Sequence, residues 1–178
     1  NILLEVITKN KTVAVFSRYK LVKNFNKLVY DNESLINLRI LKNPLKKTIL
    51  SSYSGTSPNL YCNKTIKKSG GCNLKLFIED FSLVLGIAKY GDFSFIDNIT
   101  SYGPSDDPNR IMMGKKTQLI HDFNAALYYF FIKNNKISNN IKMLACKKAI
   151  GRTEKWARRL KNQSIFNKMN FLKIKLFF

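Results

Sequence analysis

The basic side chains between residues 147 and 161 are the ones whose type and spacing indicate chemistry most directly. Seven of these fifteen residues are Lys or Arg, and Glu154 is the single acid among them. Such side chains neutralise the phosphates of a nucleic acid, and each neutralised phosphate releases counterions. The alternative for the lysines is a solvated helix face. We expect phosphate contact from Lys147, Lys148, Arg152, Lys155, Arg158, Arg159 and Lys161.

Trp156 lies in the middle of this basic stretch. Its ring offers a surface on which an RNA base can stack, or an anchor for packing in a core or an interface. We place Trp156 with the RNA-binding residues because cations surround it in the sequence.

A second basic patch lies in residues 51–72. This segment is rich in Ser, Gly, Pro and Asn, which form turns, and it therefore predicts a long loop. Its glycines would let the backbone approach phosphate closely, but the GxxxxGK[ST] order of a P-loop is missing. We expect a basic loop that enters folded RNA, with a plain solvated loop as the alternative. The expected contacts are Lys64, Lys67 and Lys68.

Metal binding and catalysis have weaker support. The three cysteines and the histidine could supply the four ligands of a zinc ion. Zinc modules, however, normally contain two cysteines about two to four residues apart, and this sequence has no such pair. Asp106 and Asp107 would point apart in an extended loop, and a single histidine leaves little for acid and base chemistry. We expect no metal, no cofactor, no small-molecule substrate and no enzymatic activity. The zinc candidates are Cys62, Cys72, His121 and Cys146.

Charge along the chain is uneven. Residues 1–76 carry +11, residues 77–107 carry −5 and residues 108–178 carry +14, which gives the net charge of +20. A charge of this size opposes compaction unless a polyanion neutralises it, and clustered Lys and Arg are typical of nucleic-acid binding. We expect the acidic middle segment to face protein or solvent rather than RNA.

Composition bounds the class of protein. The chain of 178 residues fits one small domain, and 45% hydrophobic residues are enough for a core. No run of about eighteen apolar residues exists, so we expect no membrane span. Lys, Asn, Ile, Phe and Tyr supply 84 residues, a bias typical of the AT-rich genes of organelles and also of some parasites and viruses. We therefore expect a mitochondrial matrix location, and the odd number of cysteines fits a reduced compartment.

Hydrophobic periodicity and turn residues predict both strands and helices. In the first half, the expected elements are a strand hairpin at 2–7 and 12–16, a basic amphipathic helix at 18–30, and a segment at 34–50, broken at Pro44, that fits strand or helix and that we interpret as strand. A strand at 74–78, a core helix or strand at 81–90 and irregular structure at 91–113 follow. The rest would form helices at 117–133 and 141–150, a break at Gly151, a short helix capped by Thr153, and a strand or docked tail at 172–176.

These elements predict a single small α+β domain with basic loops and an extended C-terminal tail. Residues 1–133 would form the α+β core, with the basic loop at 51–72 and an irregular acidic segment at 77–107. Residues 134–178 would form a basic helical and tail extension.

The stretch Arg152-Thr153-Glu154-Lys155-Trp156-Ala157-Arg158 resembles the Arg-Thr-Glu-Trp stretch in the C-terminal domain of the third small-subunit ribosomal protein family. It covers seven residues, carries the additional Lys155, and has Gly151 alone where that family usually has paired glycines. The resemblance implies that Arg152 and Arg158 contact rRNA.

The main hypothesis from the sequence is a structural constituent of an organellar, mitochondrial ribosome that binds ribosomal RNA and neighbouring ribosomal proteins. It accounts for dispersed basic charge on a chain that has a core and no catalytic motif. One alternative is an intron-encoded nucleic-acid enzyme, such as an endonuclease or maturase. The other is a peripheral subunit of an organellar membrane complex, whose charge would meet anionic lipid headgroups.

Overall fold

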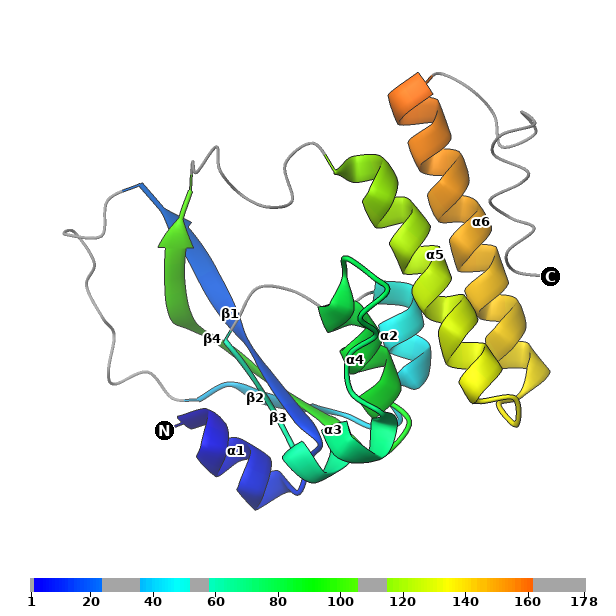
Figure 1. The fold of residues 1–178 in the computed structure, drawn as a ribbon. Coiled ribbons are helices and arrows are strands. Elements are labelled where there is room, and N and C mark those ends of the chain that lie inside the picture. Colours follow the sequence, from blue (N-terminus) through cyan, green and yellow to red (C-terminus); the bar gives the residue numbers. More distant parts are fainter. Residues whose placement is uncertain (1, 24–35, 52–57, 106–114, 162–178) are drawn as a thin grey trace.

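A computed structural model describes residues 2–23, 36–51, 58–105 and 115–161 of the chain. Within these ranges the chain forms six helices and one four-stranded mixed sheet, which confirms the predicted α+β class (Figure 1). In chain order the elements are α1 (Ile2–Asn10), β1 (Ala14–Val22), β2 (Leu38–Leu41), α2 (Leu45–Ser51), β3 (Asn59–Tyr61), α3 (Asn63–Ser69), α4 (Glu79–Ile87), β4 (Phe93–Pro104), α5 (Lys116–Lys133) and α6 (Asn139–Lys161).

The sheet has the strand order β2-β4-β1-β3. The two central strands, β1 and β4, are parallel over their whole length, from Ala14 beside Phe93 to Val22 beside Pro104. The edge strands β3 and β2 are antiparallel to their neighbours. A parallel pair needs a long crossover connection, and here β2, α2, β3, α3 and α4 all lie between the two central strands in the chain.

The two faces of the sheet are covered by different helices. Alternate residues of a strand point to opposite faces, so Val15 of β1 packs against Val6 and Ile7 of α1. Its neighbour Phe16 points the other way and packs with Val84 of α4. The sheet therefore has an apolar core on each side.

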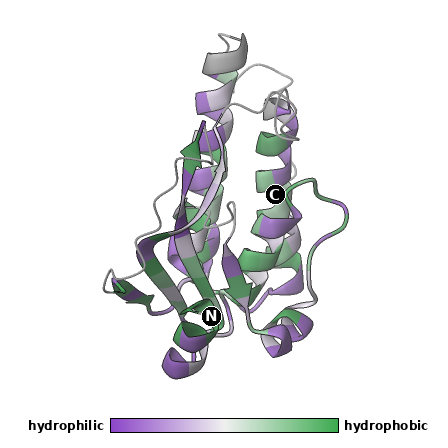
Figure 2. Cartoon of the chain, turned by 90° about the vertical axis from the view of Figure 1, so that its left-hand side faces the viewer, coloured by the Kyte–Doolittle hydropathy of each residue, from purple (hydrophilic) through white to green (hydrophobic). Residues whose placement is uncertain are grey.

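After its acidic first turn, helix α4 is apolar on the sides that face the sheet and α5, and it lies between them. Its residues Val84 and Ile87 belong to the core on the sheet side, whereas Phe81 and Leu85 belong to a second core with Leu127 of α5. Because both of these sides are apolar, α4 is buried between its two neighbours. The longer helices outside it carry both hydrophilic and hydrophobic segments, as Figure 2 shows.

The N-terminal segment forms a helix where a strand was predicted. Its apolar residues recur at helical spacing, and α1 lays this stripe on the sheet. The strand predicted at 12–16 is confirmed in β1. Because β1 continues to Val22, the helix predicted at 18–30 is wrong for residues 18–22, and residues 24–30 lie outside the described residues.

The break predicted at Pro44 is confirmed. Strand β2 ends at Leu41, and the Pro44 carbonyl accepts hydrogen bonds from the backbone N–H and the hydroxyl of Thr48, at 2.8 and 2.9 Å. Proline has a backbone angle suited to the start of a helix, so it separates β2 from α2.

Three predictions for the middle of the chain are wrong. The basic loop at 51–72 contains β3 and α3, with residues 52–57 outside the described residues. Residues 74–78 form turns rather than a strand. The acidic segment at 77–107 is regular rather than irregular, because it forms α4 and β4. Acids at the start of α4 suit the helix dipole, and the four buried residues from Phe93 to Ile96 are typical of a central parallel strand.

The helix predicted at 117–133 is confirmed as α5, but the C-terminal part is simpler than predicted. Helix α6 is continuous through Gly151, which is exposed and has open space around it. A glycine inside a helix costs about 1 kcal/mol relative to alanine, too little to interrupt a packed helix. Thr153 does not cap a helix, because its hydroxyl donates to the carbonyl of Ala149. Residues 172–176 lie outside the described residues.

The expected boundary between residues 133 and 134 falls in the turn between α5 and α6. Beyond this turn α6 packs against both α5 and α2. None of the helices in the described ranges has the length and apolarity needed to span a membrane.

Candidate nucleic-acid interface

Helix α6 has one small, buried side. Ala145, Ala149, Thr153 and Ala157 follow one another at four-residue intervals, and each is at most 8% exposed. Residues at this spacing lie on the same helix face, and their small side chains allow the neighbouring helices to approach closely. This stripe therefore fixes which way the rest of α6 points.

The opposite side of α6 is basic. Helical geometry puts Lys147, Lys155 and Arg158 there, and all three are exposed. Within the described residues the two lysines make no ion pair, whereas Arg158 donates to the Glu154 carboxylate at 2.6 Å. Lys148 is half-buried at the margin of this face. Among the described residues of this exposed face, the ammonium groups of Lys147 and Lys155 remain available to an anion.

Arg152 turns inward instead of joining this face. Its guanidinium lies over the Phe123 ring, 4.6 Å from the centroid, and donates to Asn124 Oδ1 at 3.2 Å. Burial lowers the pKa of Arg152 to about 10, so the side chain still carries its charge at neutral pH. In the part of the chain that the structure describes, Arg152 has no carboxylate partner. It joins α6 to α5 through an aromatic and an amide contact.

The contact between α6 and α5 also contains a buried polar interaction. The Asn124 amide donates to the hydroxyl of Thr153 at 2.9 Å, and that hydroxyl donates to the Ala149 carbonyl at 2.9 Å. Buried polar groups cost little when they are hydrogen-bonded and much when a partner is lost. Asn124 therefore holds Arg152 and Thr153 together and sets the register of α6 on α5.

The other residues of α6 that were predicted to bind RNA follow this contact along the helix. Trp156 is half-buried, on the same side of the helix as Arg152. Arg159 and Lys161 belong to the last turn of α6, and their side chains are outside the described part of the structure.

The basic residues predicted for a loop stand on helix α3. Lys64, Lys67 and Lys68 are exposed, and their spacing puts them on one side of the helix. Gly70 ends the helix with a φ of 89°, in the left-handed region that favours glycine, and its N–H bonds to the Lys67 carbonyl at 3.2 Å. The two lysines in the last turn also suit the negative end of the helix dipole.

The structure does not bring the two predicted basic clusters together. Helix α3 lies below the sheet and α6 on the outside of the helical layer (Figure 1). Near the end of α3 lie two lysines that the sequence did not single out: Lys133 of α5 is beside Gly70, and Lys89 shares the Tyr90 ring with Lys68. Both are isolated in the sequence, so a search for contiguous clusters passes over them.

The zinc candidates are also apart. Among the described residues no three His, Cys, Asp or Glu side chains are placed to hold a metal ion. His121 Nδ1 is 2.8 Å from the neighbouring Asp122 carboxylate, which also accepts the Phe77 N–H at 2.7 Å. Asp122 is buried, so this pair ties the segment before α4 to α5. Asp106 and Asp107 lie outside the described residues.

The three cysteines are free. Hydrogen bonds from the Thr65 side chain and backbone lower the pKa of the Cys62 thiol, while burial raises those of Cys72 and Cys146. These separate environments give the cysteines no shared chemistry.

Comparison with known proteins adds no family assignment. No protein-family model matches the chain, and a search of curated proteins found no significant match.

Proposed function

We propose that this chain is a structural, rRNA-binding constituent of an organellar ribosome, in the mitochondrial matrix, with other ribosomal proteins as neighbours. The observation that carries the proposal is the exposed lysine face of α6, which stands opposite a buried small-residue stripe on a folded body. A helix fixed in this way presents its charges at constant positions, as phosphate contacts require.

The acids of the middle segment support the proposal because they neutralise other parts of the basic chain. Asp97 lies 3.0 Å from the Arg18 guanidinium and 4.0 Å from that of Arg39. Asp92 lies 3.7 Å from the Lys42 ammonium. These pairs lie at the two ends of the β2–β4 pairing, so Asp92 and Asp97 face basic residues of the same chain. Uncompensated charge remains on α3 and α6.

A structural role fits these surfaces better than a catalytic one. Lysines on helix faces bind phosphates without regard to base sequence, and backbone contacts fix position and orientation. The organellar location rests on the AT-rich composition and on no structural feature.

Co-sedimentation tests the proposed function. Native organellar extract is separated on a sucrose gradient at low and high salt, with and without ribonuclease, and the chain is followed with an antibody. We expect it to migrate with one ribosomal subunit at low salt and to leave that fraction after ribonuclease or at high salt, because phosphate contacts are salt-sensitive. A chain that migrates free of RNA at low salt contradicts the proposal.

A further inference from the structure

Three lysines that are distant from one another in the sequence lie near Tyr90, two of them over its ring and the third at the pocket that Tyr90 also lines. The Lys68 and Lys89 ammonium groups lie 4.8 and 5.3 Å from the centre of the Tyr90 ring. The Lys133 ammonium lies beside Gly70, 3.9 Å from where a side chain at that glycine would begin. We call Lys68, Lys89, Lys133 and Tyr90 the Tyr90 cluster. Its members come from α3, from the turn after α4 and from the last turn of α5.

Hydrogen bonds hold these three elements in place. Lys89 donates to Asn134 Oδ1 at 2.7 Å, and the Asn134 amide donates back to the Phe130 carbonyl of α5 at 2.7 Å. The Tyr90 N–H bonds to the Ile87 carbonyl at 2.9 Å, which fixes the ring after α4. The lysine positions therefore follow from the packing of the fold.

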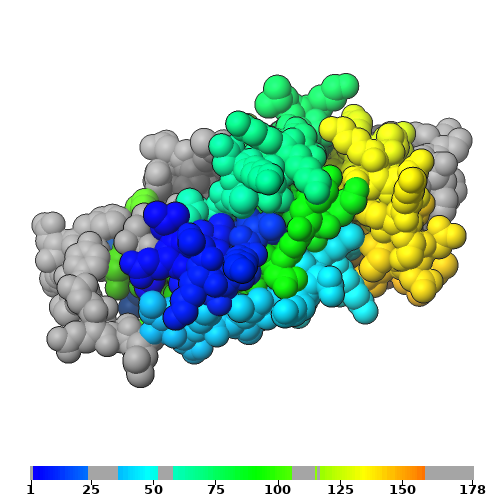
Figure 3. Space-filling model, turned by 90° about the horizontal axis from the view of Figure 1, so that it is seen from below, coloured from blue at the N-terminus to red at the C-terminus, as the bar shows by residue number. Residues whose placement is uncertain are grey.

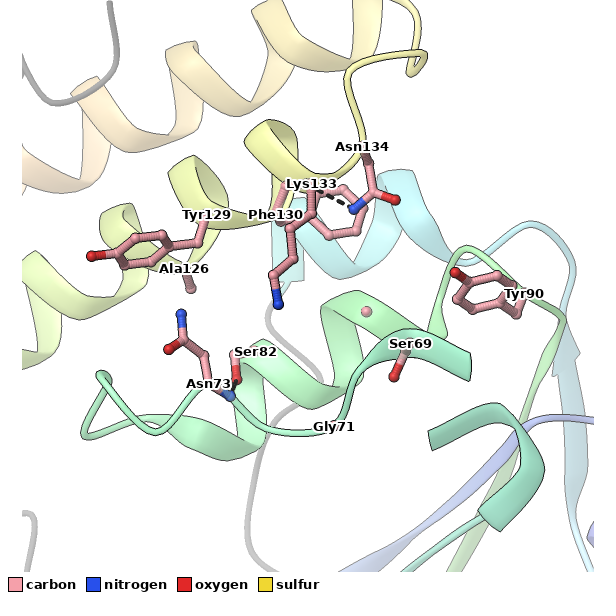
Figure 4. Close-up of a pocket in the computed structure, with 11 residues that line it drawn as sticks. Ser69, Gly71, Asn73, Ser82, Tyr90, Ala126, Tyr129, Phe130, Lys133 and Asn134 are labelled. Atoms are coloured by element: carbon pink, nitrogen blue, oxygen red, sulfur yellow. Dashed lines mark hydrogen bonds between the residues drawn. The ribbon is translucent and has the colours of Figure 1, made fainter. Parts of the chain in front are cut away.

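A small polar pocket adjoins the cluster (Figure 4). Gly71, Gly86 and Ala126 leave a cavity of about 50 Å³ between the segment after α3, α4 and α5. In Figure 4 the Lys133 side chain extends from α5 across this space toward the segment that carries Gly71 and Asn73. A water needs roughly 10–15 Å³ of such space and small-molecule pockets hold about 300–1,000 Å³, so the cavity suits one small polyatomic group.

The charges around this pocket favour an anion. Within the described residues none of the three lysines makes an ion pair with a carboxylate, and all three are exposed. Ammonium groups gathered at one ring repel each other, and a cation–π contact offsets only about 0.5–1 kcal/mol for an exposed pair. A bound anion would remove this repulsion, and Lys is a common point-charge ligand of phosphate.

The cluster also lies where a long polymer can reach it. Seen from below in Figure 3, the α3 segment (blue-green) adjoins the end of α5 and the following turn (yellow) on one outer surface. An RNA backbone passing over this surface would meet lysines from all three elements.

We propose that the Tyr90 cluster binds a phosphate group of an RNA backbone, with Lys133 holding it at the small pocket and with Lys68 and Lys89, supported by the Tyr90 ring, beside it. The identity of the RNA as ribosomal rests on the proposed function, whereas phosphate binding by the cluster does not. Phosphate in solution and lipid headgroups share this chemistry, so the test includes all three.

The main experiment measures binding of the full chain to polyuridine RNA over a series of salt concentrations. Each lost phosphate contact on a single strand lowers the slope of log K against log salt by about 0.7. We expect a fall of at least this size in the variant Lys68→Gln, Lys89→Gln, Lys133→Gln. A matched control, Lys9→Gln, Lys46→Gln, Lys47→Gln, removes the same charge from exposed lysines of α1 and α2 and should retain the slope.

A second measurement avoids dependence on a folded variant. The wild-type chain with isotope-labelled lysine side chains is titrated with inorganic phosphate and followed by nuclear magnetic resonance. The ammonium-side signals of Lys68, Lys89 and Lys133 should shift together and saturate, while those of the control lysines should not. Shifts of equal size at all lysines, or an equal fall in slope for both triple variants, would show general charge effects and overturn the proposal.

Two further outcomes separate this inference from the proposed function and from membrane binding. If the wild-type chain fails to co-sediment with ribosomes but the triple variant still loses RNA contacts, the ribosomal role fails and the cluster stands. If the wild-type chain co-sediments with ribosomes and the triple variant keeps the wild-type slope, phosphate binding by the Tyr90 cluster is contradicted while the ribosomal role stands. If the triple variant binds phosphatidylserine vesicles more weakly but binds RNA as the wild type does, the cluster is a membrane site and the proposal of RNA binding is overturned.

Discussion

The exposed face of α6 and the Tyr90 cluster are both basic surfaces, but the chain builds them in opposite ways. The α6 face comes from one continuous stretch of sequence, and its orientation depends on the buried small-residue stripe and on the buried Asn124–Thr153 contact with α5. The Tyr90 cluster collects single lysines from three elements, and its geometry depends on the packing of all three. Density of charge in the sequence is thus a poor measure of density of charge on the surface.

The difference between the α6 face and the Tyr90 cluster depends most on the small-residue stripe that orients α6. We expect Ala149→Leu to destabilise the protein by about 3 kcal/mol, because a larger side chain in a close helix contact forces α6 away from α5. The measurement is the free energy of unfolding in urea. The control Lys147→Ala, on the exposed side of the same helix, should change that free energy by no more than about 0.5 kcal/mol. Equal effects of the two changes would mean that α6 has no fixed buried side.

Two basic residues of α6 separate packing from phosphate contact. We expect Arg152→Gln to cost about 1–2 kcal/mol of stability, because the Phe123 and Asn124 contacts lose their guanidinium. Lys155→Gln should leave stability within about 0.5 kcal/mol but lower the salt slope of RNA binding by about 0.7. Urea unfolding and a salt series on the same two variants provide the measurements. The reverse pattern would restore Arg152 as the phosphate contact that the sequence indicates.

The smallest expected effect is on the titration of Tyr61, which tests whether the segment that leads into α3 packs tightly on the sheet. Tyr61 immediately precedes the α3 region, and burial, partly offset by a hydrogen bond from the Asn59 side chain, raises its pKa from 10.0 to about 12. The protonated phenol therefore contributes stability that is fully present below pH 10 and is lost as pH rises toward 12. Absorbance titration should show one tyrosine ionising late, and Tyr61→Phe should remove that step. A wild-type titration with all tyrosines near pH 10 would mean that Tyr61 is solvated.

The elements that the sequence predicts well are those with local causes. The apolar stripe of α5 and the break at Pro44 depend on neighbours within a few residues, and both are confirmed. The structure of β4 depends instead on partners far along the chain, whereas the helical spacing of the apolar residues in α1 is a local signal that the strand prediction missed. Gly91 and the polar residues before Pro104 indicated irregular structure, yet pairing with β1 and β2 makes this segment the longest strand described.

The same distinction between local and distant causes applies to the candidate binding residues. The sequence located the lysines of α6 and α3 but did not show that Arg152 turns inward, because that depends on Phe123 and Asn124 of another helix. Lys89 and Lys133 carry no local signal, since each is a single lysine near the end of a helix. Only the packing of α3, α4 and α5 brings Lys68 to the ring beside Lys89 and Lys133 to the adjoining pocket.

The parallel pairing of β1 with β4 has a consequence for the order of folding. Ala14 pairs with Phe93, so the central partner of β1 does not exist until more than half of these 178 residues have been synthesised. Contacts at this sequence separation form slowly, whereas the α5–α6 helix pair closes over a turn of a few residues. During synthesis the half-built sheet exposes an unpaired strand edge beside apolar residues, a state that invites association with other chains. The α5–α6 pair can therefore fold faster than the sheet, although the sheet's first central strand is synthesised earlier.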